Sequence, residues 1–296
     1  MKGLRRSLHF VPGGNERMFD KALTLPADSL ILDLEDAVTP ERKPGAREQV
    51  CAWLNQADFG QQEKLVRINP LDSAWGREDL DAVMRCAPDG IVVPKVNDLK
   101  AIEAIDKLLI AMEIDLDPDK PIPLLIIGTE DATAIFNLHR TLSHARVDSV
   151  AWAAEDLSAS LGARIKRDEQ GNYLEVFGFV RSWCLLAAVA AEIQAVDGPF
   201  VDIKDTEGLA RECKLTADMG YTGKLTIHPS QIEIVNQAFM PTAEEIEQAE
   251  ALLKAFEENQ AEGRMAFSFN GEMVDVPHLK RAEGILQRAR SLQQDL

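Results

Sequence analysis

The sequence predicts a (β/α)8 TIM barrel followed by a C-terminal helical extension or lid. Eight short apolar segments alternate with helix-forming segments, and no two are joined by a two-residue hairpin turn. Strict alternation of strand and helix is typical of a parallel sheet, and eight such units favour closure into a barrel. An open doubly wound sheet is the alternative fold. Its usual GxGxxG phosphate loop is not present, because the first strand is followed by PGGN.

Each expected strand is a short apolar run that stops at a proline, a glycine or a charged residue, and a helix-forming segment follows it. The strands are expected at 8–11, 29–32, 65–68, 90–93, 122–127, 149–153, 195–197 and 224–227. Helices are expected at 15–25, with Asn15 as its cap, at 44–55, 79–86, 99–114 and 209–219, and from Ala132 and Val176 onward. The longest apolar stretch, 183–193, is rich in alanine and predicts a buried helix.

The chain beyond the eighth strand is longer than a barrel needs, so we expect two domains: a catalytic barrel over 1–240 and an extension over 241–296. Thr242 and Glu245 form a capping-box pattern that begins an acidic helix ending near Asn259. A glycine-containing segment and a last helix from about Leu279 follow. An extension of this kind serves oligomer packing or acts as a lid.

Composition restricts the partners of this chain of 296 residues. It has 49 acidic and 32 basic residues and a formal charge of −17, which disfavours nucleic acid and anionic membrane partners. Its four cysteines are widely spaced and include no CxxC pair, which favours reduced thiols in a cytoplasmic protein. The first residues lack the apolar core of a signal peptide, and no apolar run is long enough to span a membrane.

The stretch 150–162, VAWAAEDLSASLG, best illustrates the expected active-site edge. An apolar run stops abruptly at Glu155 and Asp156, which places both acids at the carboxyl end of a buried strand. The simpler interpretation is a helix cap made by Asp156 or Ser158. The catalytic interpretation is favoured because the same pattern recurs at other strand ends.

Seven of the eight strand ends carry an ionisable group. In chain order these groups are Asp33 with Glu35 and Asp36, Arg67, Lys95, Glu130, Asp156, Asp197 and His228. Acids from different strands with no nearby cysteine predict an all-oxygen site for a hard cation, chiefly Mg²⁺ with Mn²⁺ as a possible substitute. Arg67 and Lys95 would then hold an anionic substrate. The alternative is a ring of ion pairs that only closes the barrel mouth.

Nine motifs, in register along nearly the whole chain, resemble the citrate lyase β-subunit-like family of the HpcH/HpaI aldolase superfamily. They are RRSLHFVPGG, LDLEDAV, RIN, VPKV, TE at 129–130, AAEDLSASLG, GKLTIHPSQI, NQAFMPTAEE and GEMVDVPH. The family includes malyl-CoA, β-methylmalyl-CoA and citramalyl-CoA lyases. The resemblance implies a TIM barrel assembled as a homotrimer or hexamer. It also implies Mg²⁺-dependent cleavage or formation of a carbon–carbon bond in a 3-hydroxyacyl-CoA, with an acyl-CoA and a 2-oxo acid (glyoxylate or pyruvate) as the other partners.

The resemblance also implies roles for individual residues. Glu130 and Asp156 match the two Mg²⁺ ligands, and Arg67 matches the arginine that contacts the reacting thioester and acid. The positions that match contacts to coenzyme A are Phe10, Lys21, Ile227 and His228, whereas Asp36, with Asp33 and Glu35, matches the acidic loop below the metal. Two departures from the family pattern are Asn15, where many relatives have arginine, and Asp131, an extra acid after Glu130.

These residues suit the chemistry of a 3-hydroxyacyl thioester lyase. Mg²⁺ would act as Lewis acid on the 2-oxo acid, and Arg67 would stabilise the enolate oxygen of the thioester. Three alternatives stay open: a citrate lyase β subunit acting on an acyl carrier protein thioester, an aldolase on free 2-oxo acids, and a non-catalytic scaffold or metabolite-binding subunit.

Asp275 matches the carboxylate that some longer members of the family deliver from the C-terminal segment over a neighbouring subunit's active site. It lies between Val274 and Val276 in GEMVDVPH, and the resemblance implies that it exchanges the proton at the enolate carbon. Its position just before Pro277 and an expected helix also suits a helix cap.

Overall fold

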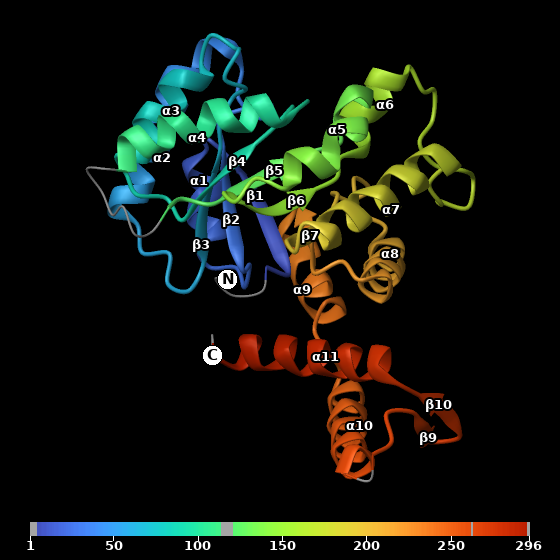
Figure 1. Ribbon diagram of the computed structural model, residues 1–296. Coiled ribbons are helices and arrows are strands. Elements are labelled where there is room, and N and C mark those ends of the chain that lie inside the picture. Colours follow the sequence, from blue (N-terminus) through green and yellow to red (C-terminus); the bar gives the residue numbers. More distant parts are fainter. Residues whose placement is uncertain (1–4, 114–120, 262, 295–296) are drawn as a thin grey trace. The chain divides into compact units, whose positions relative to one another are not determined.

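The computed structural model describes residues 5–113, 121–261 and 263–294 (Figure 1). The chain divides into two compact units, residues 5–236 and the residues from 237 onward. The domain boundary expected after Met240 stays a prediction, and the end of the helix expected at 99–114 lies outside the described residues.

Eight parallel strands close into a barrel in the larger unit, in the order of the chain (Figure 1). They are β1 (Ser7–Pro12), β2 (Ser29–Asp33), β3 (Glu63–Arg67), β4 (Gly90–Val93), β5 (Leu124–Ile127), β6 (Val147–Ala151), β7 (Gln194–Asp197) and β8 (Gly223–Thr226). The predicted TIM barrel is therefore confirmed. Closure between β8 and β1 depends on Gly223, because a Cβ there would lie 2.0 Å from the carbonyl oxygen of Arg5.

The barrel interior is filled by an apolar cluster with a member from every strand. This cluster consists of Leu8, Ile31, Leu65, Val92, Leu125, Ile127, Ala151, Ala153, Val196 and Leu225, with Phe10 packed against it. Side chains two residues apart on a strand share a face. Asp33 therefore follows Ile31, and Arg67 follows Leu65, on the interior side at the carboxyl edge of the barrel.

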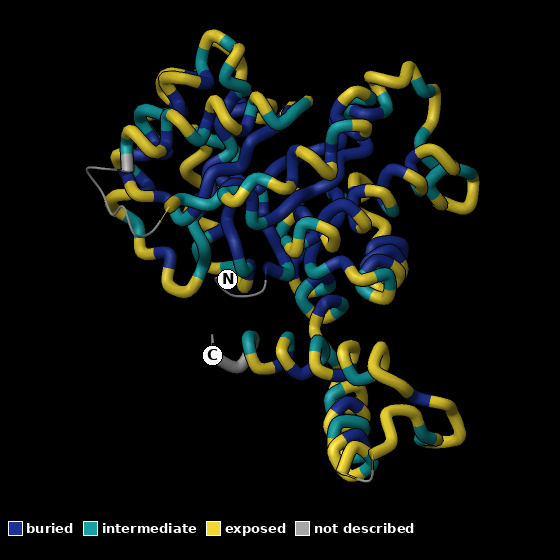
Figure 2. The backbone as a smooth tube through the Cα atoms, in the orientation of Figure 1, coloured by how far each residue is buried: buried dark blue, intermediate teal, exposed yellow. Residues whose placement is uncertain are grey.

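Helices separate the strands and leave them buried, as Figure 2 shows. Between the strands lie α1 (Glu16–Ala22), a 3-10 turn η1 (Pro40–Arg42), α2 (Lys43–Gln56), α3 (Gly76–Met84), α4 (Leu99–Glu113), α5 (Ala132–Leu142), α6 (Ala154–Leu161), α7 (Glu175–Ala190) and α8 (Thr206–Met219). After β8 comes α9 (Pro229–Ala238), a helix that the sequence analysis did not predict.

The expectation of a buried helix over 183–193 is wrong in two respects. Helix α7 ends at Ala190, and one of its faces is exposed, with Leu186 at 63% and Val189 at 64%. Apolar composition alone cannot reveal this, because an alanine-rich helix buries its small residues and can still present larger ones to solvent. None of the helices in the described part of the chain is both long and apolar enough to cross a bilayer.

The smaller unit contains α10 (Ala243–Ala261), the antiparallel strands β9 (Phe267–Phe269) and β10 (Glu272–Val274), and α11 (Val276–Gln294). The predicted capping box is confirmed, since the backbone N–H of Glu245 donates to Thr242 Oγ1 at 3.2 Å and that of Thr242 donates to Glu245 Oε2 at 2.8 Å. Ala249, Ala282 and Leu286 form the centre where α10 packs on α11.

Sequence reasoning missed the β9–β10 hairpin. Its turn is Asn270–Gly271, with φ angles of 50° and 87°. An Asn-Gly pair between two short alternating segments is a strong hairpin signal, because both turn positions require positive φ. The signal was present in the printed sequence.

His9, on β1, gives the barrel a pH-dependent stability. It is 3% exposed and its Nδ1 lies 3.0 Å from Thr226 Oγ1. Burial, with a smaller contribution from His228, lowers the pKa of His9 to about 4. Since an unfolded histidine titrates near 6.5, this contribution is present above that pH and is lost as the pH falls towards 4.

We therefore expect the free energy of unfolding to fall by roughly 2–3 kcal/mol more in the wild type than in His9→Gln between pH 6.5 and 4. Urea unfolding at several pH values measures the difference. Carboxylates elsewhere titrate in the same way in both proteins, so their contributions cancel when the two free energies of unfolding are compared. If the free energy of unfolding depends on pH in the same way in both proteins, His9 does not make this contribution.

Candidate active site

Arg67 is held at the barrel mouth by a two-pronged ion pair. Its Nε and Nη2 each donate to one carboxylate oxygen of Asp33 at 2.7 Å. Nη1 lies 3.0 Å from Glu35 Oε2, as an ion pair without an aligned hydrogen bond, and 3.8 Å from Asp36 Oδ2. The guanidinium also lies over the ring of Phe10, 4.7 Å from its centroid. These contacts fix the planar group in one orientation.

Asp33 in turn is fixed by the loop that follows β2. It is 1% exposed and accepts hydrogen bonds from the backbone N–H groups of Glu35, at 2.9 Å, and Ala37, at 3.2 Å. Asp33 is therefore a positioning group for Arg67, not a free acid. Arg67 remains charged, because the hydrogen bonds and charges of these acids raise its pKa although burial lowers it.

Lys95 connects the acidic loop after β2 to the end of β5. Its Nζ donates to Glu35 and lies 3.3 Å from Asp36 Oδ1, while its backbone N–H donates to Glu130 Oε2. Its φ of 54° is rare for a residue with a side chain and costs roughly 1–3 kcal/mol, a strain that is typical of functional sites. The predicted anionic-substrate contact of Lys95 is at present an ion pair with Glu35.

Glu130 and Asp156 bring carboxylates from two neighbouring strand ends. Glu130 follows β5 and is 5% exposed, whereas Asp156 lies in the first turn of α6 and is half-buried. The helix cap considered for Asp156 or Ser158 is not formed: the cap residue of α6 is Ala153, which makes no side-chain cap hydrogen bond. The Asp156 carboxylate is therefore not used as a cap.

Negative charge exceeds positive charge at this mouth. The five carboxylates are Asp33, Glu35, Asp36, Glu130 and Asp156, and the three cations are Arg67, Lys95 and the buried Lys43, whose Nζ donates to the backbone carbonyl oxygens of Leu34 and Glu35. Burial, with repulsion from Asp156 and Glu35, raises the pKa of Glu130 to about 8 although the backbone N–H of Lys95 opposes the shift. Mg²⁺ takes sites with one or two carboxylates and keeps water in the remaining positions. The donor set therefore fits a divalent cation, which would relieve the repulsion.

Two strand-end acids do not belong to the site. Asp131 is the cap of α5, where it accepts from the backbone N–H of Thr133 at 2.7 Å, and this hydrogen bond lowers its pKa. Asp197 is completely buried and pairs with Lys224 and with Trp152 Nε1. Among the described residues, no set of three or more His, Cys, Asp or Glu side chains is arranged to hold a metal; the predicted site has two.

The residues expected to contact coenzyme A belong to two neighbouring strand–helix units, the first and the eighth. Phe10 is on β1 beside Arg67, and Lys21 is exposed in the last turn of α1. Ile227 and His228 follow β8, which pairs with β1, and their backbone N–H groups both face Gln231 Oε1, at 2.9 and 3.3 Å. Asn15 caps α1 by accepting from the backbone N–H of Met18.

Asp275 lies in the smaller unit, between β10 and α11. Its side chain is 52% exposed, and Oδ1 lies 2.7 Å from His278 Nδ1. It thus has the helix-start position that the cap interpretation requires, with a histidine ring as its partner. Its catalytic role stays a prediction.

The fold and the mouth together define a class of enzyme. A TIM barrel whose carboxyl edge presents a fixed arginine next to paired carboxylates is suited to metal-assisted chemistry on a carbonyl compound that acquires negative charge.

Comparison with known proteins narrows this class. The model of the HpcH/HpaI aldolase/citrate lyase family matches residues 6–229. A (3S)-malyl-CoA thioesterase from Cereibacter sphaeroides is 36% identical over 97% of this chain and 95% of that protein, and the mitochondrial citramalyl-CoA lyase of Rattus norvegicus is 33% identical over 98% and 87%. The crystal structure of CitE from Mycobacterium tuberculosis in complex with magnesium, acetoacetate and coenzyme A is similar with a TM-score of 0.79 and 33% identity, covering 98% of this chain and 100% of that one. This chain belongs to the HpcH/HpaI aldolase/citrate lyase family, as its motifs predict.

Proposed function

We propose that the chain is a Mg²⁺-dependent carbon–carbon lyase. It cleaves or forms a 3-hydroxyacyl-CoA such as malyl-CoA, β-methylmalyl-CoA or citramalyl-CoA, with glyoxylate or pyruvate and an acyl-CoA as the other partners. The observation that carries the proposal is the mouth itself, where Arg67, held by Asp33, shares one barrel edge with Glu130 and Asp156. Membership of a family that contains citramalyl-CoA lyase supports it.

Each mouth residue has a role in this reaction. Glu130 and Asp156 would hold Mg²⁺, or Mn²⁺ in its place, and the bound cation supplies Lewis-acid stabilisation for the 2-oxo acid oxygens. Arg67 stabilises the negative charge that develops on the thioester oxygen in the enolate. Asp33 and Glu35 orient Arg67, and Asp36, which lies near both Arg67 and Lys95, tunes the charge of this loop. Phe10, Lys21, Ile227 and His228 contact the coenzyme A portion.

The chain also presents a surface that suits self-association into the proposed homotrimer or hexamer. On α5, Phe136 is 89% exposed, and on α7, Phe179 and Leu186 are 61% and 63% exposed. Phe179 stacks on Trp183, which donates to the carbonyl oxygen of Ile135, so the two helices form one apolar face. Light scattering of the purified protein gives the subunit number. We place the enzyme in the cytoplasm, which suits its four free thiols.

A second candidate function is hydrolysis of the same thioester. It is favoured by the similarity to a (3S)-malyl-CoA thioesterase over 97% of this chain. The two reactions leave different products: a lyase releases a 2-oxo acid and an acyl-CoA, whereas a thioesterase releases free coenzyme A thiol. Malyl-, β-methylmalyl-, citramalyl- and citryl-CoA with Mg²⁺ should therefore be assayed for both products.

Five outcomes are informative when a citryl thioester of acyl carrier protein and free 2-oxo acids are added to this panel. A 2-oxo acid without free thiol supports the lyase, and free thiol without a 2-oxo acid supports the thioesterase. Turnover only of a citryl thioester on acyl carrier protein would indicate a citrate lyase β subunit. Turnover of free 2-oxo acids without any thioester would indicate an aldolase. No turnover in any arm, with or without EDTA, would leave a non-catalytic subunit.

Asp275 is proposed as the acid/base group, acting in a neighbouring subunit's active site. Asp275→Asn keeps the shape of the side chain and its contact with His278 but cannot transfer a proton, so we expect a loss of roughly 10²–10⁴ in kcat. Mixing Asp275→Asn with inactive Glu130→Gln chains should restore partial activity. Glu272→Gln, at an exposed acid of the same hairpin, is the matched control. Normal turnover of Asp275→Asn would remove the role, and failure to complement in proven mixed oligomers would place Asp275 in its own subunit's site.

A further inference from the structure

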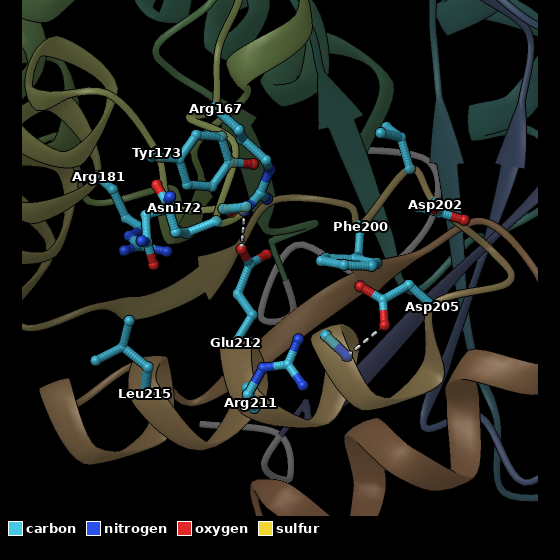
Figure 3. A pocket seen from close by; sticks show the side chains of 14 residues that line it. Arg167, Asn172, Tyr173, Arg181, Phe200, Asp202, Asp205, Arg211, Glu212 and Leu215 are labelled. Carbon is cyan, nitrogen blue, oxygen red and sulfur yellow. Dashed lines mark hydrogen bonds and ion pairs between the residues drawn. The ribbon is translucent and has the colours of Figure 1, made fainter.

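A cavity of about 470 Å³ lies in the larger unit, away from the mouth residues described above. Its lining comes from the segment between α6 and α7, from α7, from the segment between β7 and α8, and from α8. Figure 3 shows Arg181, Asn172 and Tyr173 together on one side and Phe200 on the other, with α8 below. Both polar and apolar side chains thus reach one space of ligand size.

The buried charges beside this cavity neutralise one another, with one exception. Lys224 Nζ pairs with Asp197 and, at 2.9 Å, with Glu212, and Arg167 Nη1 pairs with Glu212 Oε2 at 2.7 Å. Two cations therefore meet two carboxylates. The guanidinium of Arg167 also lies 3.6 Å from the centroid of the Tyr173 ring, which holds it at the cavity wall.

Arg181 is the exception. It is 8% exposed, it lines the cavity, and no described residue accepts a hydrogen bond from its Nε or Nη1. Its guanidinium is instead placed between two rings, 5.9 Å from the centroid of Trp152 and 5.3 Å from that of Tyr173. Arginine side chains stay positively charged in proteins, and a buried positive charge whose N–H groups have no hydrogen-bond acceptor is unfavourable. The cavity therefore lacks a negatively charged group to pair with Arg181.

The outer part of the cavity controls what can enter. Asp202, Asp205 and Arg211 are exposed lining residues. Asp205 Oδ1 accepts from the backbone N–H of Gly208 at 2.8 Å, so it is engaged as the cap of α8. Apolar atoms of Phe200, Val201 and Leu215 complete the wall. This combination suits a molecule with one charged end and a carbon body, because the acids would repel a second anionic group near the entrance.

We propose that this cavity is a second ligand site, which binds a small organic oxyanion, a carboxylate or a phosphate ester, by pairing its charged group with Arg181. The guanidinium of Arg181 supplies the positive charge and N–H groups for such a group, and the body of the ligand contacts Phe200, Val201 and Leu215. The site is separate from the proposed lyase mouth and does not depend on its activity.

Calorimetric titration of the full chain with butyrate and with propyl phosphate, in chloride buffer of constant ionic strength, tests the proposal. We expect one site per chain for at least one of these probes, and the stronger one identifies the carboxylate or the phosphate as the preferred group. Arg181→Leu should weaken binding roughly 10–100-fold, because the charge-assisted hydrogen bonds are lost. Arg85→Leu, which removes the same charge from an exposed position outside the cavity, should bind as the wild type does.

Two further variants show whether the probe binds in this cavity and not at the lyase mouth. Leu215→Trp fills the cavity without touching the charge of Arg181 and should also weaken binding, whereas Arg67→Ala changes only the lyase mouth and should leave this binding unchanged. Because Arg181→Leu removes an unpaired buried charge, its melting temperature without ligand should not be lower than that of the wild type. Added probe should raise the melting temperature of the wild type but not that of Arg181→Leu.

Three results would overturn the proposal. One is the absence of binding of both probes to the wild type at millimolar concentration. Another is equal binding by the wild type and Arg181→Leu. The third is a change of subunit number in Arg181→Leu with unaltered probe binding, which would mean that the cavity receives part of a second copy of the chain.

Discussion

Replacing Glu130 by glutamine should abolish Mg²⁺ binding and almost all turnover. Glu130 is the buried member of the proposed ligand pair, and repulsion from Asp156 and Glu35 opposes its ionised form until a cation is present. Glutamine keeps the shape and the hydrogen bond from Lys95 but removes the charge. Groups that only orient a metal ligand are worth roughly 10–100-fold, so losing a ligand itself should cost more than about a hundredfold in kcat/KM. Asp156→Asn should behave alike.

The neighbouring acids provide matched controls for both substitutions. Asp131→Asn and Glu155→Gln remove a negative charge one residue away from each proposed ligand. Asp131 is a helix cap and Glu155 pairs with Lys166, so these variants should retain Mg²⁺ and turnover. Metal content after dialysis, calorimetry with Mg²⁺, and kcat/KM with and without EDTA are the measurements. Full metal occupancy and normal rates in Glu130→Gln would remove Glu130 from the site.

Replacing Arg67 by lysine should cost most of the activity although the charge is kept. The guanidinium uses two nitrogens on Asp33 and keeps a third, Nη1, towards Glu35 and Asp36. The ammonium group of lysine cannot keep the two-nitrogen contact with Asp33 and at the same time donate to a developing oxyanion. Removal of one such donor typically costs roughly 10²–10³ in kcat, and we expect that range for Arg67→Lys. The loss should appear in kcat more than in KM, because the enolate charge exists only near the transition state.

Arg47 offers a control of the same chemistry outside the mouth. It bridges α2 to α3 through Asp79 and Glu78, both at 2.8 Å, so Arg47→Lys should lower stability and leave the kinetics unchanged. Asp33→Asn should resemble Arg67→Lys, since it frees the guanidinium from its two-pronged partner. If Arg67→Lys has normal kcat/KM while Arg67→Ala only unfolds at a lower temperature, Arg67 merely balances the charge of the acidic loop.

Local sequence patterns predicted the barrel and the carboxyl edge at which its site lies. Each strand is an apolar run, seven of the eight have an ionisable residue at or just after the carboxyl end, and parallel strands bring those ends together. Glu130, Asp156 and Arg67 could therefore be expected on one edge without knowledge of any contact. The capping box at Thr242 and the helix cap at Asn15 were equally visible, because their partners lie within three residues.

Helix α9 and the hairpin of the smaller unit show a different kind of miss. The Asn270–Gly271 turn is a local signal that was present in the sequence. Helix α9 begins at Pro229, a residue well suited to the first turn of a helix. Both signals are local, because proline fixes φ at about −65° and an Asn-Gly pair adopts positive φ without any distant contact.

Local sequence patterns place these residues at the strand ends, but whether each one is free to act depends on the side chains that surround it in the folded chain. Asp197 and Asp33 end strands in the same way, yet one is neutralised by Lys224 and the other orients Arg67. The unpaired nitrogens of Arg181 on α7 are likewise invisible in the sequence. The physical reason is that the energy of a buried charge depends on its partners within a few ångströms, and those partners come from distant positions along the chain.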